Sequence, residues 1–436
     1  MILPVILSIV LLVVLVGWGK FQPFIAFIIS ALFAGLLLGI PVDKITGSIE
    51  TGIGAMLGPL AIIICLGAMF GKLIADSGAA QRIAQSLVTM FGERRITLAL
   101  ACAGFITGIP LFYNVGFVLM VPLVFSLVYR TRLPAVYLGI PLLAGLSIAH
   151  GFLPPHPSPT ALVAQLGAST GLTLIYGFIV GIPALLLAGP VFATTLRNME
   201  SKPLDLFSAK DLRDEELPSA GLSFTCALLP VALIALTTAL TYLVHVPGNA
   251  GKVLTFIGNP SIVMLVSLGV ATILLGPARG ISIARLMGAY GDAVRDIAGI
   301  LLIIAGAGAL KQIYVDSGVS AELGASLAAL PLHPLLLGWL IALAIRLALG
   351  SATVAGLTAA GIAQPIVTAT GVDPNLMVLA IGAGSVMCSH VNDSGFWMFK
   401  EYFNLNLRDT FRSWTLMETI VGTSGLVFVL LLSLWV

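Results

Sequence analysis

Charged side chains are scarce in this sequence. Only 9% of its 436 residues are Asp, Glu, Lys or Arg, whereas 58% are hydrophobic. A soluble domain carries about 25% charged residues, so the composition excludes a soluble enzyme and a disordered scaffold. The 21 Lys and Arg nearly balance the 19 Asp and Glu, which leaves no basic face for nucleic acid. We therefore expect an integral membrane protein whose surroundings are a lipid bilayer and which binds no nucleic acid.

Cysteine and the common cofactor motifs are equally sparse. The four cysteines, Cys65, Cys102, Cys226 and Cys388, lie far apart in apolar stretches and are predicted to pack in the core. The sequence has no G-x-x-x-x-G-K-[ST] loop for ATP and no H-E-x-x-H motif for zinc. We expect no metal, no cofactor and no enzymatic activity. A membrane-embedded enzyme that uses His156 and Asp393 as metal ligands or acid–base groups remains a rival hypothesis.

Long apolar runs take the place of polar surface. The runs at 61–70 and 226–240 are continuous rather than alternating. Only helices and closed barrels satisfy every backbone group in lipid, and barrel strands alternate in polarity, so the predicted fold class is an all-α integral membrane protein. Residues 1–16 have no basic start and no small-residue cleavage site, and they are expected to form a retained first span.

The chain also repeats itself in the same order at one main shift. A glycine-centred polar break near Gly108 has a counterpart near Gly350. We interpret the repetition as an internal duplication with cores at about 21–196 and 258–435. Three further landmarks return 240 positions later: the Asp-Ser-Gly motif at 76–78 as 316–318, Pro134 as Pro374, and His150 as His390.

Basic residues predict that the two copies have opposite orientations. Arg130 and Arg132 place one loop inside the cell, whereas the equivalent loop at 371–373 carries Asp373 and no basic residue. The segment 96–129 is too short for two spans of about 20 residues each. We therefore predict that it is a re-entrant hairpin and that the hairpin at 334–370 enters from the other face. Two inverted repeats are the plan of secondary transporters.

The predicted organisation has ten crossings and two hairpins, with both termini outside. Each repeat contains a re-entrant hairpin and a broken transmembrane helix. The predicted parts are an N-terminal span at 1–20, repeat 1 at 21–196 with hairpin 96–129 and broken helix 134–170, a cytoplasmic linker at 197–221, a connecting span at 222–257, and repeat 2 at 258–436 with hairpin 334–370, broken helix 374–395 and last span 413–435.

Four polar breaks interrupt the apolar segments, at 108–114, 150–160, 350–353 and 389–395. Prolines and glycines end helices there, and irregular backbone at membrane depth is tolerated only where it is buried or lines a wet cavity. Each break should expose amides at a helix start, which favours anions. We expect the four breaks to converge on a carboxylate substrate that also carries hydroxyl groups.

Side chains in these breaks are the candidate site residues. Asp393 is the first choice for the proton carrier because an intramembrane carboxylate is costly and usually functional; His150 or His390 is the second. Arg346 is expected to pair with an anionic substrate or with Asp393, or to reach the outer surface. The predicted substrate-binding residues are Tyr113, Asn114, His156, Ser158, Thr160, Arg346, Ser351, Thr353 and Asn392.

The breaks resemble the gluconate permease family over essentially the whole chain. The resemblance rests on GIPLFYNVGF (108–117), HGFLPPHPSP (150–159), LGSATV (349–354) and SHVNDSGFW (389–397). It implies proton-coupled uptake of gluconate or a related sugar acid across a bacterial inner membrane, by a homodimer that moves as an elevator. One departure concerns Asn114, where some relatives carry Glu; if that Glu carries the proton, this chain uses another group.

The sequence leaves rival functions open. The runner-up within the same class is a symporter for another small hydroxy acid such as D-serine. The rival of another class is an anion channel, which would need a continuous polar pore. The four local breaks, with no polar stripe along any span, favour a gated site and hence a secondary active transporter.

Overall fold

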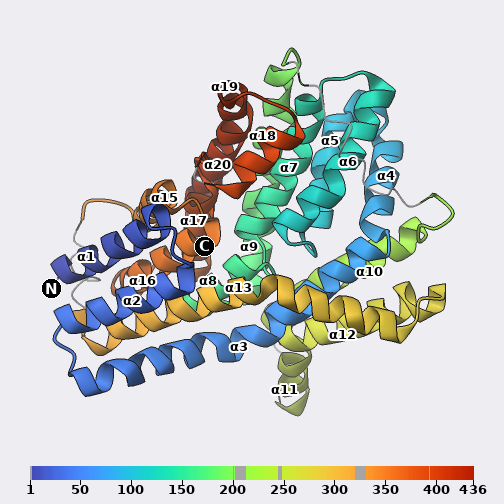
Figure 1. The fold of residues 1–436 in the computed structure, drawn as a ribbon. Coiled ribbons are helices and arrows are strands. Elements are labelled where there is room, and N and C mark those ends of the chain that lie inside the picture. Colours follow the sequence, from blue (N-terminus) through green and yellow to red (C-terminus); the bar gives the residue numbers. More distant parts are fainter. Residues whose placement is uncertain (1, 200, 202–212, 244–247, 320–329, 392) are drawn as a thin grey trace.

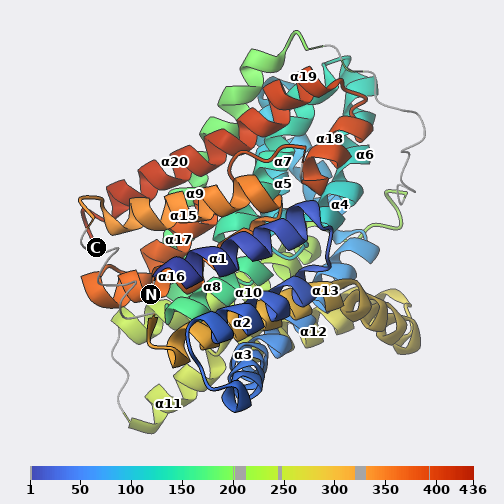
Figure 2. The same cartoon turned by 60° about the vertical axis from the view of Figure 1, so that its left-hand side comes forward.

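The computed structural model describes residues 2–199, 201, 213–243, 248–319, 330–391 and 393–436. Throughout these residues the secondary structure is helical, and no strand occurs among them. The predicted all-α membrane fold class is therefore confirmed. Helices predominate because they satisfy every backbone amide and carbonyl within a single apolar segment. The two chain ends lie toward the same side of the molecule in the view of Figure 2.

Helix length and composition support a multi-pass membrane protein. Among the described residues, seven helices are long and apolar enough to cross a membrane, or eight if the bent helix at 42–76 counts as one span. Five shorter apolar helices accompany them. The ten crossings expected from the sequence remain a prediction.

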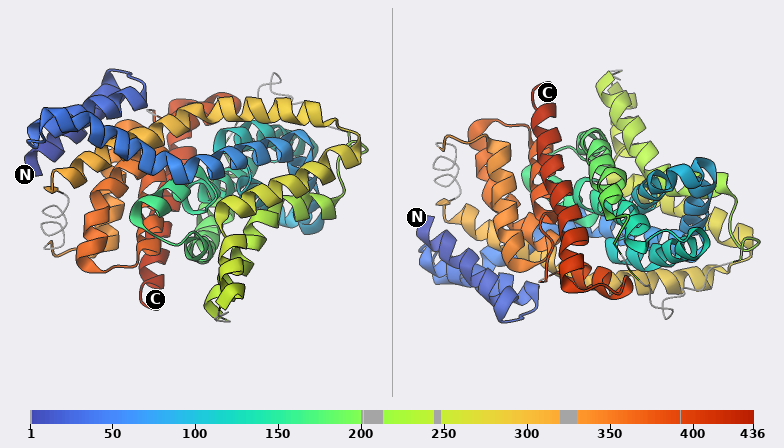
Figure 3. Two further views of the ribbon diagram at one scale, coloured as in Figure 1. Left: turned by 90° about the horizontal axis from the view of Figure 1, so that it is seen from below. Right: turned by 90° about the horizontal axis from the view of Figure 1, so that it is seen from above.

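Two long helices, α3 (Val42–Asp76) and α13 (Ile283–Asp316), form one side of the molecule (Figures 1 and 3). They are 35 and 34 residues long, well beyond the roughly 20 residues that span a bilayer, because each begins with a charged N-terminal part that needs no lipid. They are antiparallel: Arg279, just before α13, donates a hydrogen bond to the carbonyl of Ser77, just after α3, at 3.0 Å. Gly52 and Gly308 face each other where the helices cross.

The α3–α13 crossing has no room for a side chain. A Cβ added to Gly308 would lie 2.4 Å from the carbonyl oxygen of Gly52. We expect Gly308→Leu to lower the melting temperature of the detergent-purified protein by several degrees, because overpacking costs about 1–3 kcal/mol. Gly54→Leu is the matched control, since no atom lies within 4 Å of its added Cβ. Equal melting temperatures for the two variants would contradict this close approach.

Four helix pairs are interrupted where the sequence predicted breaks. In the first half, α5 (Ile96–Gly108) gives way to α6 (Tyr113–Thr131), and α7 (Ala135–Phe152) to α8 (Pro157–Leu166). Glycine and proline account for the breaks: Gly350 has a φ of +71°, which favours glycine, and Pro157 occupies the first turn of α8. The equivalent pairs in the second half are α15 (Pro334–Leu349) with α16 (Ala352–Thr370), and α17 (Pro374–Val386) with α18 (Ser394–Tyr402).

The remaining helices surround this interrupted core. Part of the predicted linker, 202–212, lies outside the described residues, and the predicted connecting span consists of two helices, α10 and α11. These outer helices are α1 (Ile2–Val13), α2 (Pro23–Leu37), α4 (Ala79–Phe91), α9 (Thr170–Leu186), α10 (Ala220–Leu243), α11 (Gly248–Ile257), α12 (Pro260–Leu275), α19 (Leu407–Thr410) and α20 (Leu416–Leu432).

Small residues bring the central helices into backbone contact. A Cβ on Gly145 of α7 would lie 2.6 Å from the carbonyl oxygen of Ala101 on α5, and a Cβ on Gly384 of α17 would lie 2.4 Å from that of Trp339 on α15. Such close approaches are typical of helix packing in membranes, where dispersion contacts replace the hydrophobic effect. Helix α5 therefore packs tightly on α7, and α15 packs tightly on α17.

Candidate functional site

A cavity of about 260 Å³ lies between the two halves of the chain. Small-molecule sites occupy roughly 300–1,000 Å³, so this volume suits a small ligand. The starts of α6, α16 and α18 line it, together with α7, α13 and α20. The polar lining residues are Tyr113, Ser147, His150, Arg346, Ser351, Thr353, Asp393, Trp414 and Glu418.

Arg346 and Asp393 form an ion pair in the cavity wall. The Arg346 side chain is 4% exposed and that of Asp393 is 16% exposed, so Arg346 does not reach the outer surface. Asp393 also accepts hydrogen bonds from the hydroxyl of Ser389 and, at 2.9 Å, from the amide of Gly395 at the start of α18. Trp414 donates to Ser389 at 2.7 Å and holds that hydroxyl in place. Three donors therefore converge on the Asp393 carboxylate.

Several buried polar atoms of the cavity residues are left without a protein partner. Nε and Nη1 of Arg346, Nδ1 of His150 and Oε2 of Glu418 have no hydrogen-bond partner among the described residues. A buried, unsatisfied polar group costs about 1–3 kcal/mol, and a charged group costs more. Their convergence on one cavity indicates a site that a polar ligand completes.

Glu418 is the principal residue that the sequence reasoning missed. It lies on α20, inside the predicted last span, and is 4% exposed. The hydroxyl of Ser147 on α7 donates to its Oε1. The available signal was a lone carboxylate within an apolar span, which the membrane disfavours unless it has a function. Ser147 gave no such signal, since serine is common in membrane helices.

His156, Ser158 and Thr160 are not among the residues that line this cavity. The imidazole Nε2 of His156 donates to the carbonyl of Gly108 at 2.8 Å, which ties the α7–α8 break to the first hairpin tip. Ser158 and Thr160 are buried on α8, and Ser158 faces Gly356 of α16. These three residues lie outside the cavity lining, and their contact with the substrate stays a prediction.

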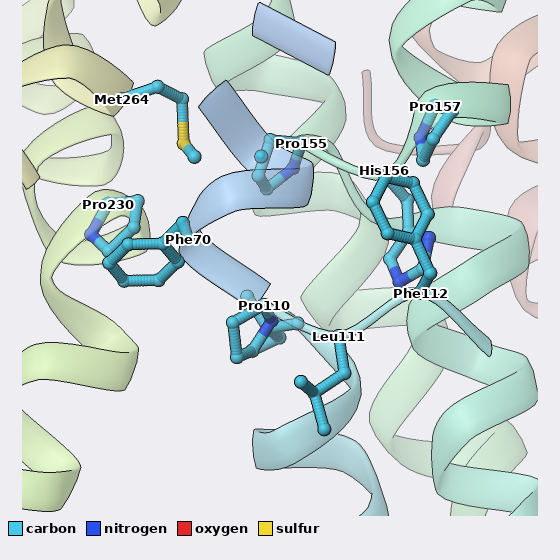
Figure 4. A pocket seen from close by; sticks show the side chains of 11 residues that line it. Phe70, Pro110, Leu111, Phe112, Pro155, His156, Pro157, Pro230 and Met264 are labelled. Atoms are coloured by element: carbon cyan, nitrogen blue, oxygen red, sulfur yellow. The ribbon is translucent and has the colours of Figure 1, made fainter. Parts of the chain in front are cut away.

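A small apolar recess lies between the α7–α8 break and helices α3, α10 and α12 (Figure 4). It measures about 20 Å³, and a single water needs roughly 10–15 Å³, so it cannot hold a sugar acid. Figure 4 shows the ring of Phe112 beside that of His156, and the two ring centroids are 6.1 Å apart. Pro110 and Leu111 lie below Pro155 in the same view. The start of α8 therefore faces the turn between α5 and α6, whereas His150 of the same break lines the large cavity. Convergence of the four breaks on a substrate stays a prediction.

The other predicted residues have different positions. The imidazole Nε2 of His390 lies 3.2 Å from the carbonyl oxygen of Leu347. His390 therefore links the α17–α18 break to the end of α15. His150 lines the cavity, with its ring 5.8 Å from that of Tyr113 and 5.2 Å from that of His156. Asn392 lies outside the described residues. Asn114 is in the first turn of α6, and its side chain is not described.

Hydroxyl groups and helix starts line the same cavity as the Arg346 guanidinium. Ser351 caps α16, where its hydroxyl accepts from the amide of Val354 at 3.3 Å, and Thr353 in the first turn of α16 lines the same cavity. The starts of α6, α16 and α18 add partial positive charge. Together with Arg346, they can hold a carboxylate and hydrogen-bond several hydroxyls. Among the described residues, no group of three or more His, Cys, Asp or Glu is placed to hold a metal ion.

An all-helical multi-pass fold with interrupted helices around a polar cavity defines a membrane transport protein. The GntP family permease model matches residues 1–435. The chain belongs to the GntP permease family.

Curated relatives cover almost the whole chain. A high-affinity gluconate transporter of Escherichia coli is 46% identical over 99% of this chain and 98% of its own length. An L-idonate transporter of the same organism is 44% identical over 96% of each chain. A gluconate permease of Bacillus subtilis is 45% identical over 99% of this chain and 98% of its own length. The relatives are transporters rather than enzymes.

Two solved structures share the fold at low sequence identity. The YdaH transporter of Alcanivorax borkumensis aligns with a TM-score of 0.64 over 94% of this chain and 97% of its own, at 17% identity. MtrF of Neisseria gonorrhoeae aligns with a TM-score of 0.65 over 95% of this chain and 94% of its own, at 15% identity. At these identities the likeness concerns the fold alone.

Proposed function

We propose that this chain imports gluconate or a closely related sugar acid together with protons, by secondary active transport across a bacterial inner membrane. The relatives' names supply the substrate class, because several are gluconate transporters and one is an L-idonate transporter. Gluconate and idonate are stereoisomers: each is a six-carbon chain with one carboxylate and five hydroxyls. A sugar acid of this kind is the substrate that the cavity must accommodate.

One observation carries the proposal: a buried guanidinium with unpartnered N–H donors opens into a cavity ringed by hydroxyls. A carboxylate oxygen that accepts from Nη1 or Nε of Arg346 would satisfy these donors with charge-assisted hydrogen bonds. The sugar hydroxyls would then meet Tyr113, Ser351 and Thr353. Arg346 would thus select substrates with a negative charge, and the hydroxyls of Tyr113, Ser351 and Thr353 would select substrates with several hydroxyl groups.

The architecture of the proposed transporter is two inverted repeats, each with a re-entrant hairpin and a broken helix. Its support is the antiparallel contact of α3 and α13, since each ends in the Asp-Ser-Gly motif and precedes one hairpin. Corresponding helices that lie antiparallel are what an inverted duplication produces. The proposal also includes the domain boundaries predicted from the sequence. It further includes a homodimer that moves as an elevator, with both termini of the chain outside the cell.

Competition of labelled gluconate uptake tests the substrate class. The purified protein in proteoliposomes, with acid outside, is challenged with gluconate, L-idonate, glucuronate, D-serine and glucose. We expect the aldonates to compete best, and glucose to fail because it lacks the carboxylate that Arg346 would bind. Inhibition by D-serine alone would move the function to the hydroxy-acid alternative, and uptake that never exceeds equilibrium would support a channel.

Cysteine labelling tests the inverted orientation of the repeats. Arg132 follows α6, and Ala369 lies in the last turn of α16, both exposed. In a background without native cysteines, we expect a membrane-impermeant thiol reagent to label Arg132→Cys only from inside and Ala369→Cys only from outside. Labelling of both positions from one face would contradict both the inversion and the opposite entry of the hairpins.

The hydroxyl of Thr353 provides a milder test of the site. Thr353→Val keeps the shape of the side chain and removes one hydrogen bond to the substrate, which contributes about 0.5–1.5 kcal/mol. We expect gluconate binding to weaken about two- to tenfold, as measured by calorimetry in detergent. Thr358→Val on the same helix is the matched control, because its hydroxyl donates to the carbonyl of Val354. Unchanged affinity in Thr353→Val would remove this hydroxyl from the site.

A further inference from the structure

Glu418 is a buried carboxylate that takes no part in the Arg346–Asp393 ion pair and, among the described residues, belongs to no group that could bind a metal ion. It is 4% exposed and lines the same cavity as Arg346. Ser147 donates to one of its oxygens, while Oε2 has no partner among the described residues. A carboxylate with one free oxygen in a polar cavity can accept a proton there without breaking another contact.

The charged groups around Glu418 come from different elements. Arg346 is the sole Lys or Arg among the described residues that line the cavity, and Asp393 already occupies its Nη2. Glu418 lies in the electrostatic field of both residues. The titratable and charged groups that face it are Arg346 at the end of α15, Asp393 in the α17–α18 break, Tyr113 at the start of α6 and His150 on α7, with His156 against His150.

Charge balance makes Glu418 and the substrate competitors. With Asp393 ionised, the guanidinium neutralises one carboxylate, and an ionised Glu418 already leaves the cavity with one net negative charge. A bound sugar acid would add a second in a site largely shielded from water, where repulsion is much stronger than in bulk solvent. A protonated Glu418 removes its own repulsion of the substrate, and the unpartnered Nε and Nη1 of Arg346 can then bind the substrate carboxylate.

We propose that Glu418 is the proton-carrying group of the transport cycle, and this inference rests on the proposed function. When the cavity opens to the outside, a solvent proton binds to Oε2 of Glu418 and the sugar-acid anion binds at Arg346. The loaded cavity moves one proton and one anion together. When it opens to the inside, the anion leaves, and Glu418 returns the proton to the inner solvent.

The residues expected from the sequence to carry the proton are less suited to this task. Both oxygens of Asp393 already accept hydrogen bonds, from Arg346 and Ser389 on one side and from the amide of Gly395 on the other, whereas Glu418 has a free oxygen. His150 contacts the rings of Tyr113 and His156. No carboxylate among the described residues bonds to its imidazole, so a positive charge on His150 would have no paired anion. His390 does not line the cavity and contacts the carbonyl of Leu347.

Glu418→Gln tests the inference because the amide mimics the protonated acid. In proteoliposomes with acid outside, we expect the wild type to concentrate gluconate and the variant to lose this accumulation. The variant should keep gluconate binding and gluconate–gluconate exchange, since neither requires net proton movement. Glu401→Gln is the matched control: its side chain is 60% exposed and pairs with Lys400, so it should accumulate gluconate like the wild type.

A measurement on the unmodified protein keeps the inference testable if Glu418→Gln does not fold. Gluconate binding to the purified wild type in weakly buffered solution should take up protons, approaching one per anion at an alkaline pH where Glu418 of the empty protein is ionised. One proton with one anion is electroneutral, so a membrane potential without a pH gradient should not drive accumulation. Binding without proton uptake, or accumulation by Glu418→Gln at the wild-type level, would overturn the role of Glu418. Failure of the wild type to transport any sugar acid would instead overturn the proposed function.

Discussion

Replacing Arg346 with glutamine is expected to abolish gluconate accumulation and to weaken gluconate binding by at least about thirtyfold. Truncating one partner of a buried charge pair costs about 2–5 kcal/mol, and each 1.4 kcal/mol is tenfold in affinity. The effect should be this large because Arg346 is 3% exposed and no other Lys or Arg among the described residues lines the cavity. Calorimetric titration of the purified variant with gluconate measures it.

Arg412→Gln is the matched control for this result. Arg412 lies on an exposed face of the short helical segment Phe411–Thr415, just before α20, and its loss should leave gluconate affinity unchanged. Arg346→Lys separates charge from geometry: it keeps the positive charge but loses the planar donor set, and should bind more weakly than the wild type. Full affinity in Arg346→Gln would remove the guanidinium from the substrate site.

Asp393→Asn is expected to destabilise the protein strongly and to make its stability depend on the substrate. Removing one partner of a buried ion pair costs about 3–5 kcal/mol, because the other charge is left uncompensated. The substrate carboxylate can replace the missing anion, so saturating gluconate should raise the melting temperature more in Asp393→Asn than in the wild type. Thermal unfolding in detergent, with and without gluconate, measures both effects.

The double variant Arg346→Gln/Asp393→Asn separates charge balance from lost contacts. It removes both charges, and we expect it to melt above either single variant, as neutral replacement of a buried pair is often tolerated. Its gluconate affinity should stay as low as that of Arg346→Gln alone. Additive destabilisation in the double variant would mean that the two side chains act independently, against the ion pair seen in the structure.

The sequence predicted the interruptions of the fold because they depend on local chemistry. The prolines at Pro154, Pro155, Pro157 and Pro159 cannot continue a helix, and the structure ends α7 at Phe152 and begins α8 at Pro157. Gly350 likewise marks the turn between α15 and α16. Such residues act on their own backbone, so neighbours in space are not needed to recognise them.

Convergence of the breaks was harder to predict because it depends on tertiary packing. Arg346 and Asp393 are 47 positions apart, and the sequence left open whether Arg346 pairs, binds substrate or reaches the surface. The pairing follows from the close packing of α15 on α17, which Gly384 permits. His156 has the right chemistry for a substrate contact, but its Nε2 donates to the carbonyl of Gly108 and the residue does not line the cavity.

Glu418 and Ser147 lie 271 positions apart in two largely apolar helices. No break, motif or periodic pattern links them, and only the packing of α7 beside α20 brings the hydroxyl to the carboxylate. Polar groups in a break stand out because the backbone is interrupted there, whereas a carboxylate inside a continuous helix such as α20 does not. A search for every ionisable residue within a predicted span would have found Glu418, although not its partner.

The most direct test of the proposed site is an experimental structure of the protein with gluconate bound. We expect the gluconate carboxylate to contact the guanidinium of Arg346, its hydroxyls to reach Tyr113, Ser351 and Thr353, and Glu418 to lie within the same cavity. Gluconate bound with its carboxylate away from Arg346, for example at the start of α8 beside His156, would contradict the site described here.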